Sequence, residues 1–119
     1  MDCSKGALAR SRQEREQALR RELGRLTALL RARPDVRLVL LVGSLAEGTC
    51  GAHSDLDLVV VLDTDRSFRD RTEDLYRWLQ PELPTDLLVY TPDEWRELRQ
   101  RGFLRRAAEM GEVLHEAAA

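Results

Sequence analysis

The sequence predicts an α/β fold in which a small mixed β-sheet is flanked by helices. Three short segments that are mostly apolar and rich in β-branched residues have the length and composition of buried strands: 36–42, 55–62 and 85–90. The segments around them carry apolar residues at helical spacing and are interrupted by Pro and Gly, which favours helices between the strands. With 119 residues the chain is large enough for one core, so we expect a single domain over 1–119.

The first part of the chain, 1–33, is predicted to be an N-terminal helix. Between Ala7 and Arg33 four leucines recur at steps of four, three and four: Leu19, Leu23, Leu26 and Leu30. This stripe is narrow and the other faces carry Arg and Glu, which is typical of a helix that docks on a sheet by one face. Pro34 is expected to end the helix. The arginines leave RNA binding as an alternative, which we consider the weaker interpretation.

Two further helices are expected between the strands, a short helix or turn from Ser44 to about Gly51 and an amphipathic helix from Ser67 to Gln80. On the amphipathic helix the spacing predicts three inward-facing apolar residues flanked by two aromatic residues. These are Phe68, Leu75 and Leu79, flanked by Tyr76 and Trp78. The prolines after residue 80 should end this helix before the third strand begins.

The last part of the chain, 92–119, is predicted to form helices and a short strand. Thr91 and Glu94 have the spacing of a capping box, and Pro92 stands at the first helical position between them. A second helix is expected over 103–110 and a small terminal strand over 111–115.

Two polar features interrupt the apolar strands and point to chemistry. Gly43-Ser44 ends the first strand, where backbone N–H groups and a hydroxyl can face a phosphate. Asp55 and Asp57 open the second strand, whose period of two places both carboxylates on one face about 6–7 Å apart. Neighbouring carboxylates repel each other, and a cation such as Mg²⁺ removes that repulsion. Together these features predict a site for phosphoryl or nucleotidyl transfer.

The segment from Leu40 to Val61 resembles the signature of the DNA polymerase beta-like nucleotidyltransferase superfamily. In that signature a strand ends in Gly-Ser, a short helix contains a Gly, and Ser-Asp-x-Asp-Leu opens the next strand. The matching positions are all in register: Gly43-Ser44, Gly48 and Ser54-Asp55-Leu56-Asp57-Leu58. The resemblance implies a nucleotidyltransferase fold with 36–90 as its catalytic sheet region. The short chain is similar to the minimal nucleotidyltransferases, many of which are antitoxin partners of HEPN-domain toxins.

Asp86 is the third candidate carboxylate. It opens a strand after a helical crossover, as Asp55 does, so it can lie beside the Asp55 and Asp57 pair. The resemblance implies a third acid on this strand, and together the three would be catalytic metal ligands that help deprotonate an attacking hydroxyl. By the same resemblance, Gly43 and Ser44 would hold the phosphates of the nucleotide. The alternative is that Asp86 is a turn residue without a ligand role.

These features predict a metal-dependent nucleotidyltransferase that moves an NMP group from an NTP to a hydroxyl. By resemblance, ATP is the expected donor, two Mg²⁺ ions are the expected cofactors, and a tyrosine of a HEPN-type toxin is the expected acceptor. The chain would then be the antitoxin of a toxin–antitoxin pair. The alternatives are a small-molecule (aminoglycoside-like) nucleotidyltransferase and a non-catalytic antitoxin or nucleotide-binding module. Glu47 keeps the non-catalytic alternative open, because many members of the superfamily carry a basic residue there.

Charge and composition limit the partners and the location. The formal net charge is -2 and aromatic residues make up 5% of the chain, which argues against binding of duplex or single-stranded nucleic acid. No apolar run approaches the length of a membrane span. The two cysteines form no disulfide framework, so we expect a cytoplasmic protein. A homo-oligomer is compatible with the sequence.

Overall fold

The computed structural model describes the backbone of residues 3–117 and the side chains of residues 6–117. Along the chain the elements are α1 (Cys3–Arg31), β1 (Val36–Val42), α2 (Gly43–Glu47), β2 (Leu56–Leu62), α3 (Phe68–Leu79), β3 (Thr85–Tyr90), α4 (Pro92–Leu98), α5 (Gly102–Met110) and β4 (Glu112–Glu116). Among the described residues, no helix combines the length and the apolar character that crossing a membrane requires.

The four strands form one mixed sheet in the order β3-β2-β1-β4. β1 is antiparallel to both β2 and β4, whereas β2 and β3 are parallel. Parallel neighbours need a crossover connection, and α3 provides it between β2 and β3. The predicted α/β fold with a small mixed sheet flanked by helices is therefore confirmed.

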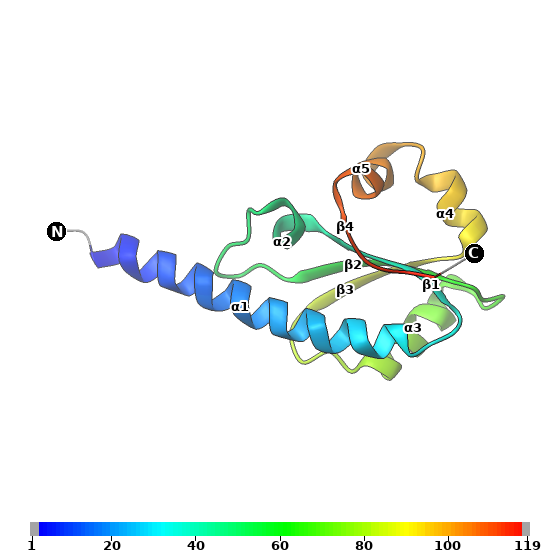
Figure 1. Ribbon diagram of the computed structural model, residues 1–119, viewed down its shortest axis with the longest axis horizontal. Helices are drawn as coiled ribbons and strands as arrows, with labels where there is room; N and C mark the ends of the chain where they lie inside the picture. The colour runs from blue at the N-terminus through cyan, green and yellow to red at the C-terminus, as the bar shows by residue number, and fades with distance from the viewer. Residues whose placement is uncertain (1–2, 118–119) are drawn as a thin grey trace.

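Helices cover both faces of the sheet (Figure 1): α1 and α3 lie on one face, and α4 and α5 lie on the other. The side chains of β1 alternate between the two cores, with Val39 and Leu41 facing α1 and α3, and Leu40 and Val42 facing α4 and α5. Burial on both faces explains why the central strands are almost continuously apolar in sequence.

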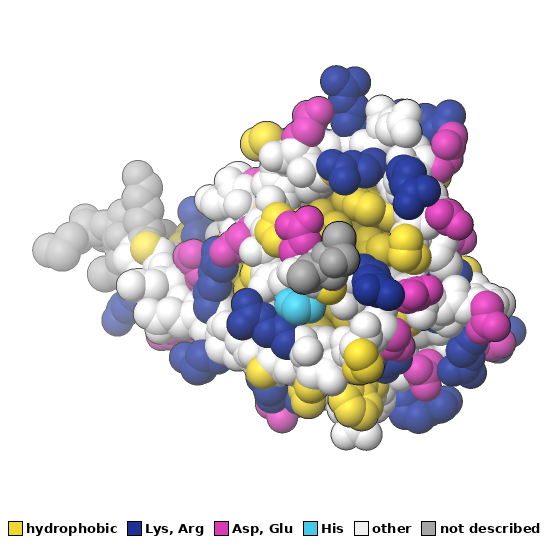
Figure 2. Space-filling model, turned by 45° about the vertical axis from the view of Figure 1, so that its right-hand side comes forward, with side chains coloured by type: hydrophobic (Ala, Val, Ile, Leu, Met, Phe, Trp, Pro, Cys, Tyr) yellow, Lys and Arg dark blue, Asp and Glu magenta, His cyan; other side chains and the backbone are white. Residues whose placement is uncertain are grey.

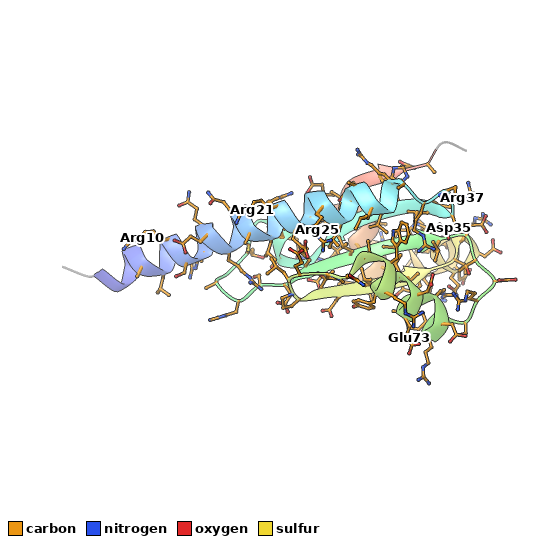
Figure 3. All side chains as sticks on the ribbon, turned by 90° about the horizontal axis from the view of Figure 1, so that it is seen from below. Arg10, Arg21, Arg25, Asp35, Arg37 and Glu73 are labelled. Atoms are coloured by element: carbon orange, nitrogen blue, oxygen red, sulfur yellow. The ribbon has the colours of Figure 1, made fainter. Side chains whose placement is uncertain are left out.

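The leucine stripe of α1 docks this helix on the sheet. Its four members are all buried in the same core: Leu19, Leu23, Leu26 and Leu30. The helix begins earlier than this stripe, and its N-terminal part, which carries Arg10, extends beyond the sheet (Figure 3). Figure 2 shows acidic and basic side chains interspersed over one face of the molecule.

The inward face of α3 differs at one position from the face that the sequence predicts. Leu75 and Leu79 are buried as expected, but the prediction for Phe68 is wrong because its side chain is 51% exposed. Phe68 is the first residue of the helix and lies at the rim of the fold, where its ring contacts Tyr90 with 6.5 Å between ring centroids. Arg71, one turn further along, takes the buried place instead.

Arg71 is 4% exposed, yet its guanidinium donates hydrogen bonds to three partners from different segments. Its Nε donates to the carbonyl of Val89, and its two terminal nitrogens donate to the carbonyl of Arg66 and to the carboxylate of Glu94. Glu94 also completes the capping box of α4, which begins at Pro92 as predicted. A buried arginine therefore ties α3 to the end of β3 and to the start of α4.

The tryptophans differ in burial. Trp95 of α4 is buried in the core on its face of the sheet, whereas the side chain of Trp78 on α3 is 48% exposed. Arg33 lies over the Trp78 ring, 5.5 Å from its centroid.

A second polar link joins α1 to the segment before β3. Arg25, labelled in Figure 3, donates to Glu22 on its own helix and to the carbonyls of Leu79 and Gln80. The buried carboxylate of Glu22 accepts the backbone N–H groups of residues 82 and 83. These bonds, with Arg25 contributing most, lower the pKa of Glu22 against the opposing effect of burial. The link holds in place the segment that leads into β3.

Tyr76 fastens the outer edge of β3 to α3. Its hydroxyl donates to the carbonyl of Thr85 at 2.8 Å and accepts the N–H of Leu87 at 3.0 Å. Since β3 is an edge strand, these two backbone groups have no neighbouring strand to pair with on that side.

We expect Tyr76→Phe to lower the free energy of unfolding by about 1–2 kcal/mol, because it leaves two backbone groups without their partner. Urea unfolding of both proteins measures the difference. Tyr90→Phe is the matched control, because within the described part of the chain its hydroxyl makes no protein hydrogen bond; its cost should be below about 0.5 kcal/mol. Equal costs for the two variants would contradict this role of Tyr76.

Candidate active site

The candidate acids meet at one end of the sheet. Asp57 is the second residue of β2 and Asp86 the second residue of β3, and the parallel register pairs them directly. Paired residues of parallel strands lie about 5 Å apart and point to the same face. Asp55 immediately precedes β2, so all three candidates come from the same end of two neighbouring strands.

Gly43 brings the end of β1 against this acidic pair. Val42 pairs with Asp57 across the antiparallel ladder, so the chain turns into α2 directly beside the Asp57 carboxylate. Gly43 has a φ of +76°, and a Cβ at this position would overlap Asp57 Oδ2. Both the backbone conformation and the close approach of the carboxylate therefore require glycine.

Burial and the neighbouring acids raise the cost of ionising Asp57. Burial is the largest cause that raises the pKa of Asp57 to about 6, followed by the charge of Asp86, a hydrogen bond with Asp86 and the charge of Asp55. Without a cation, the folded protein thus favours a protonated Asp57 well above the usual pH range of an aspartic acid.

Ser44 lies in the first turn of α2, next to Gly43. Its carbonyl accepts the N–H groups of Gly48 and Thr49, which closes this short helix. Within the described residues, the Ser44 hydroxyl donates no hydrogen bond to the protein. That the backbone and hydroxyl of Gly43 and Ser44 hold phosphates remains a prediction.

The loop before β2 is held by a residue that sequence reasoning missed. Within the loop, the hydroxyl of Ser54 accepts the N–H of Gly51 at 2.8 Å. Arg15 of α1 donates from Nε to the carbonyl of Ser54 at 2.8 Å, and its Nη2 lies 3.5 Å from Asp55 Oδ1. His53, which precedes Ser54 in this loop, is exposed.

Tyr76 is the second residue that was missed in this role. Its hydroxyl contacts the backbone on both sides of Asp86, so α3 fixes the part of β3 that carries this acid. Neither Arg15 nor Tyr76 belongs to a local motif. Arg15 acts across 39 residues, and Tyr76 contacts the next strand 9 and 11 residues further along, so both roles depend on how the helices pack on the sheet.

The model of the nucleotidyltransferase domain family matches residues 23–114, which is most of the chain. The protein belongs to the nucleotidyltransferase domain family. The nucleotidyltransferase assignment that the resemblance at Gly43-Ser44, Asp55 and Asp57 implies is therefore confirmed, whereas a minimal antitoxin with a HEPN partner remains a proposal. Arg15 lies outside the matched residues.

Solved structures share this fold. A proposed nucleotidyltransferase from Sulfolobus solfataricus is 17% identical, with a TM-score of 0.62 over 87% of this chain and 85% of that one. A toxin–antitoxin structure with AMP-PNP is 23% identical, with a TM-score of 0.50 over 79% of this chain and 73% of that one. No curated protein sequence matches the chain significantly.

The acids of this nucleotidyltransferase domain suit a hard divalent cation such as Mg²⁺ by their chemistry. Asp55, Asp57 and Asp86 offer only carboxylate oxygens, which are the ligands that Mg²⁺ prefers. Burial, and then the charges of Asp86 and Asp55, raise the pKa of Asp57, so a cation beside this carboxylate would favour its ionised form. Among the side chains of residues 6–117, however, no three acidic, His or Cys groups are already arranged as a metal site. Asp55 Oδ1 lies 3.5 Å from Arg15 Nη2, so a cation bound by this carboxylate would compete with that ion pair.

Gly43→Ala tests the close approach of the Asp57 carboxylate to the Gly43 backbone in the nucleotidyltransferase site. We expect it to lower the free energy of unfolding by about 2–4 kcal/mol, because left-handed backbone strain adds to an overlap with Asp57. Gly48→Ala is the matched control, since Gly48 has nearly the same φ, +75°, with nothing within 4 Å of its Cβ. It should cost about 1 kcal/mol. Urea unfolding that gives equal costs for the two variants would rule out the overlap.

Asp57→Asn should remove a pH-dependent destabilisation. The folded-state pKa of about 6 exceeds the ordinary value of 3.8, so the carboxyl stabilises the fold fully below about pH 4 and loses this contribution as the pH rises through 6. At pH 7.5 without metal, we expect Asp57→Asn to be more stable than the parent by on the order of 1 kcal/mol, after allowance for solvent screening.

Urea unfolding of both proteins from pH 4 to pH 8 measures this difference. Asp65→Asn, which changes an exposed carboxylate in the loop after β2, controls for the loss of one negative charge. A stability difference between Asp57→Asn and the parent that does not grow between pH 4 and pH 7 would contradict the electrostatic account of the site.

Proposed function

We propose that this protein is a metal-dependent nucleotidyltransferase that moves an NMP group, AMP from ATP, to the hydroxyl of an acceptor. The observation that carries the proposal is the direct pairing of Asp57 with Asp86 against the turn at Gly43. This pairing concentrates carboxylates beside backbone that can approach a phosphate closely. The family match supports the reaction class.

In the proposed reaction the acceptor oxygen attacks the α-phosphorus of the nucleotide. A new P–O bond forms, the bond from that phosphorus to the oxygen bridging to the β-phosphate breaks, and pyrophosphate leaves. Asp86 takes the proton of the acceptor hydroxyl. Gly43 and Ser44 hold the terminal phosphates through N–H groups and the hydroxyl. Mg²⁺ ions held by the three aspartates would neutralise phosphate charge and make the hydroxyl easier to deprotonate.

We infer that the acceptor is a tyrosine of a HEPN-type toxin and that the protein is its cytoplasmic antitoxin. The support is the resemblance to the minimal nucleotidyltransferases, together with a structural neighbour described as a toxin–antitoxin with AMP-PNP. An acceptor presented by a partner would be held in line for attack by that partner rather than by this small domain.

The function is tested by incubating the full chain with α-³²P-labelled ATP, Mg²⁺ and the protein encoded by the neighbouring gene. We expect label on that protein and release of pyrophosphate. Asp57→Asn and Asp86→Asn should each reduce the rate at least about 100-fold, because each removes a charge from the reacting centre. Asp65→Asn should transfer at the parental rate.

Three outcomes would change the proposal. Labelling of an aminoglycoside, with none of the neighbouring protein, would favour the small-molecule enzyme. Neutralisation of the neighbour without any transfer would favour a non-catalytic antitoxin. Full activity of Asp86→Asn would move the proton acceptor to another residue.

A further inference from the structure

Arg106 of α5 lies at the edge of the candidate active site. It lines a small groove between α2 and α5 together with Gly43, Glu47 and Phe103, so the groove begins at the same glycine that contacts Asp57. The groove holds about 40 Å³. That is room for two or three water molecules, and hence for the oxygens of a phosphate group but not for a nucleoside.

The site needs positive charge, and its own motif contains none. Between Gly43 and Asp57 there is no Lys or Arg, whereas this segment carries three acids. A nucleoside triphosphate adds further negative charge. Divalent cations can offset only part of this repulsion, so a basic side chain at the phosphates would strengthen binding.

In the part of the chain that the structure describes, the Arg106 guanidinium uses only some of its hydrogen-bond donors. Its Nε donates to Glu47 Oε1 at 3.0 Å, and its Nη2 contacts the same oxygen. Within the described residues, Nη1 donates to no protein group, and the side chain is 68% exposed. Both bonds to Glu47 hold the guanidinium at the groove while leaving its other edge open to a ligand.

We propose that Arg106 binds the terminal phosphates of the donor nucleotide. The inference rests on the proposed function and names a residue for its nucleotide site. The phosphates would lie near Gly43, because this residue borders both the groove and the carboxylate of Asp57. A phosphate held at Gly43 is therefore the ligand that the open edge of Arg106 can reach.

A purely structural ion pair between α2 and α5 is the competing explanation, and it predicts different results. If the pair only ties the helices together, removal of either partner should have the same small effect on stability and none on nucleotide affinity. If Arg106 binds phosphate, removal of the two partners should affect affinity in opposite directions, because Glu47 repels the ligand that Arg106 attracts.

Isothermal titration calorimetry of the full chain with ATP and Mg²⁺, and separately with AMP and Mg²⁺, tests the inference. Arg106→Ala should raise the Kd for ATP about tenfold and leave the Kd for AMP unchanged, because AMP lacks the terminal phosphates. Arg106→Lys should recover part of the affinity. Glu47→Gln should bind ATP as tightly as the parent or more tightly.

Arg105→Ala is the matched control. Arg105 is the neighbouring residue on α5, its side chain is similarly exposed at 64%, and it pairs with Glu109 of its own helix. Its replacement should leave the Kd for ATP unchanged. Thermal melts of each variant confirm that the proteins are folded at the temperature of titration.

Unchanged ATP affinity in folded Arg106→Ala would overturn the inference and leave the proposed transferase standing. So would an equal loss of affinity in Arg106→Ala and Glu47→Gln, or a loss that is as large for AMP as for ATP. If the parent protein binds neither nucleotide, the proposed function fails, and this inference fails with it.

Discussion

The parallel register between β2 and β3 is the constraint on which the candidate site depends. It sets Asp57 beside Asp86, and the helical crossover through α3 makes that register attainable. The same helix then fixes the outer edge of β3 through Tyr76, on both sides of Asp86. A single helix therefore permits the pairing of the acids and maintains it.

Holding these acids together opposes folding. The pKa of Asp57 is raised mainly by burial and then by the neighbouring acids, so at neutral pH the fold bears an electrostatic cost that a cation would relieve. The two hydrophobic cores on either side of the sheet supply the stability that tolerates this cost. The same repulsion that weakens the protein without ligand makes the site receptive to positive charge.

The sequence predicts most of the elements because their signals are local. In the buried strand β1 every residue except Arg37 is apolar, and the Asp-x-Asp spacing depends only on the two-residue period of a strand. Burial of Arg71 and exposure of Phe68 could not be predicted, because they depend on carbonyl and carboxylate partners that tertiary structure brings to α3. The link from Arg15 to Ser54 and Asp55 was missed for the same reason, since it crosses 39 and more residues.

The positive charge around the site comes from outside the motif, and from both helical layers. Arg15 reaches Asp55 from α1 on one face of the sheet, and Arg106 reaches Glu47 from α5 on the other. The segment from Gly43 to Asp57 contributes only acids and neutral groups. Its charge balance is thus a property of the packed fold, because each arginine is placed by a helix that the cores hold against the sheet. A disturbance of either layer should therefore alter the electrostatics of the site even where no residue of the motif has changed.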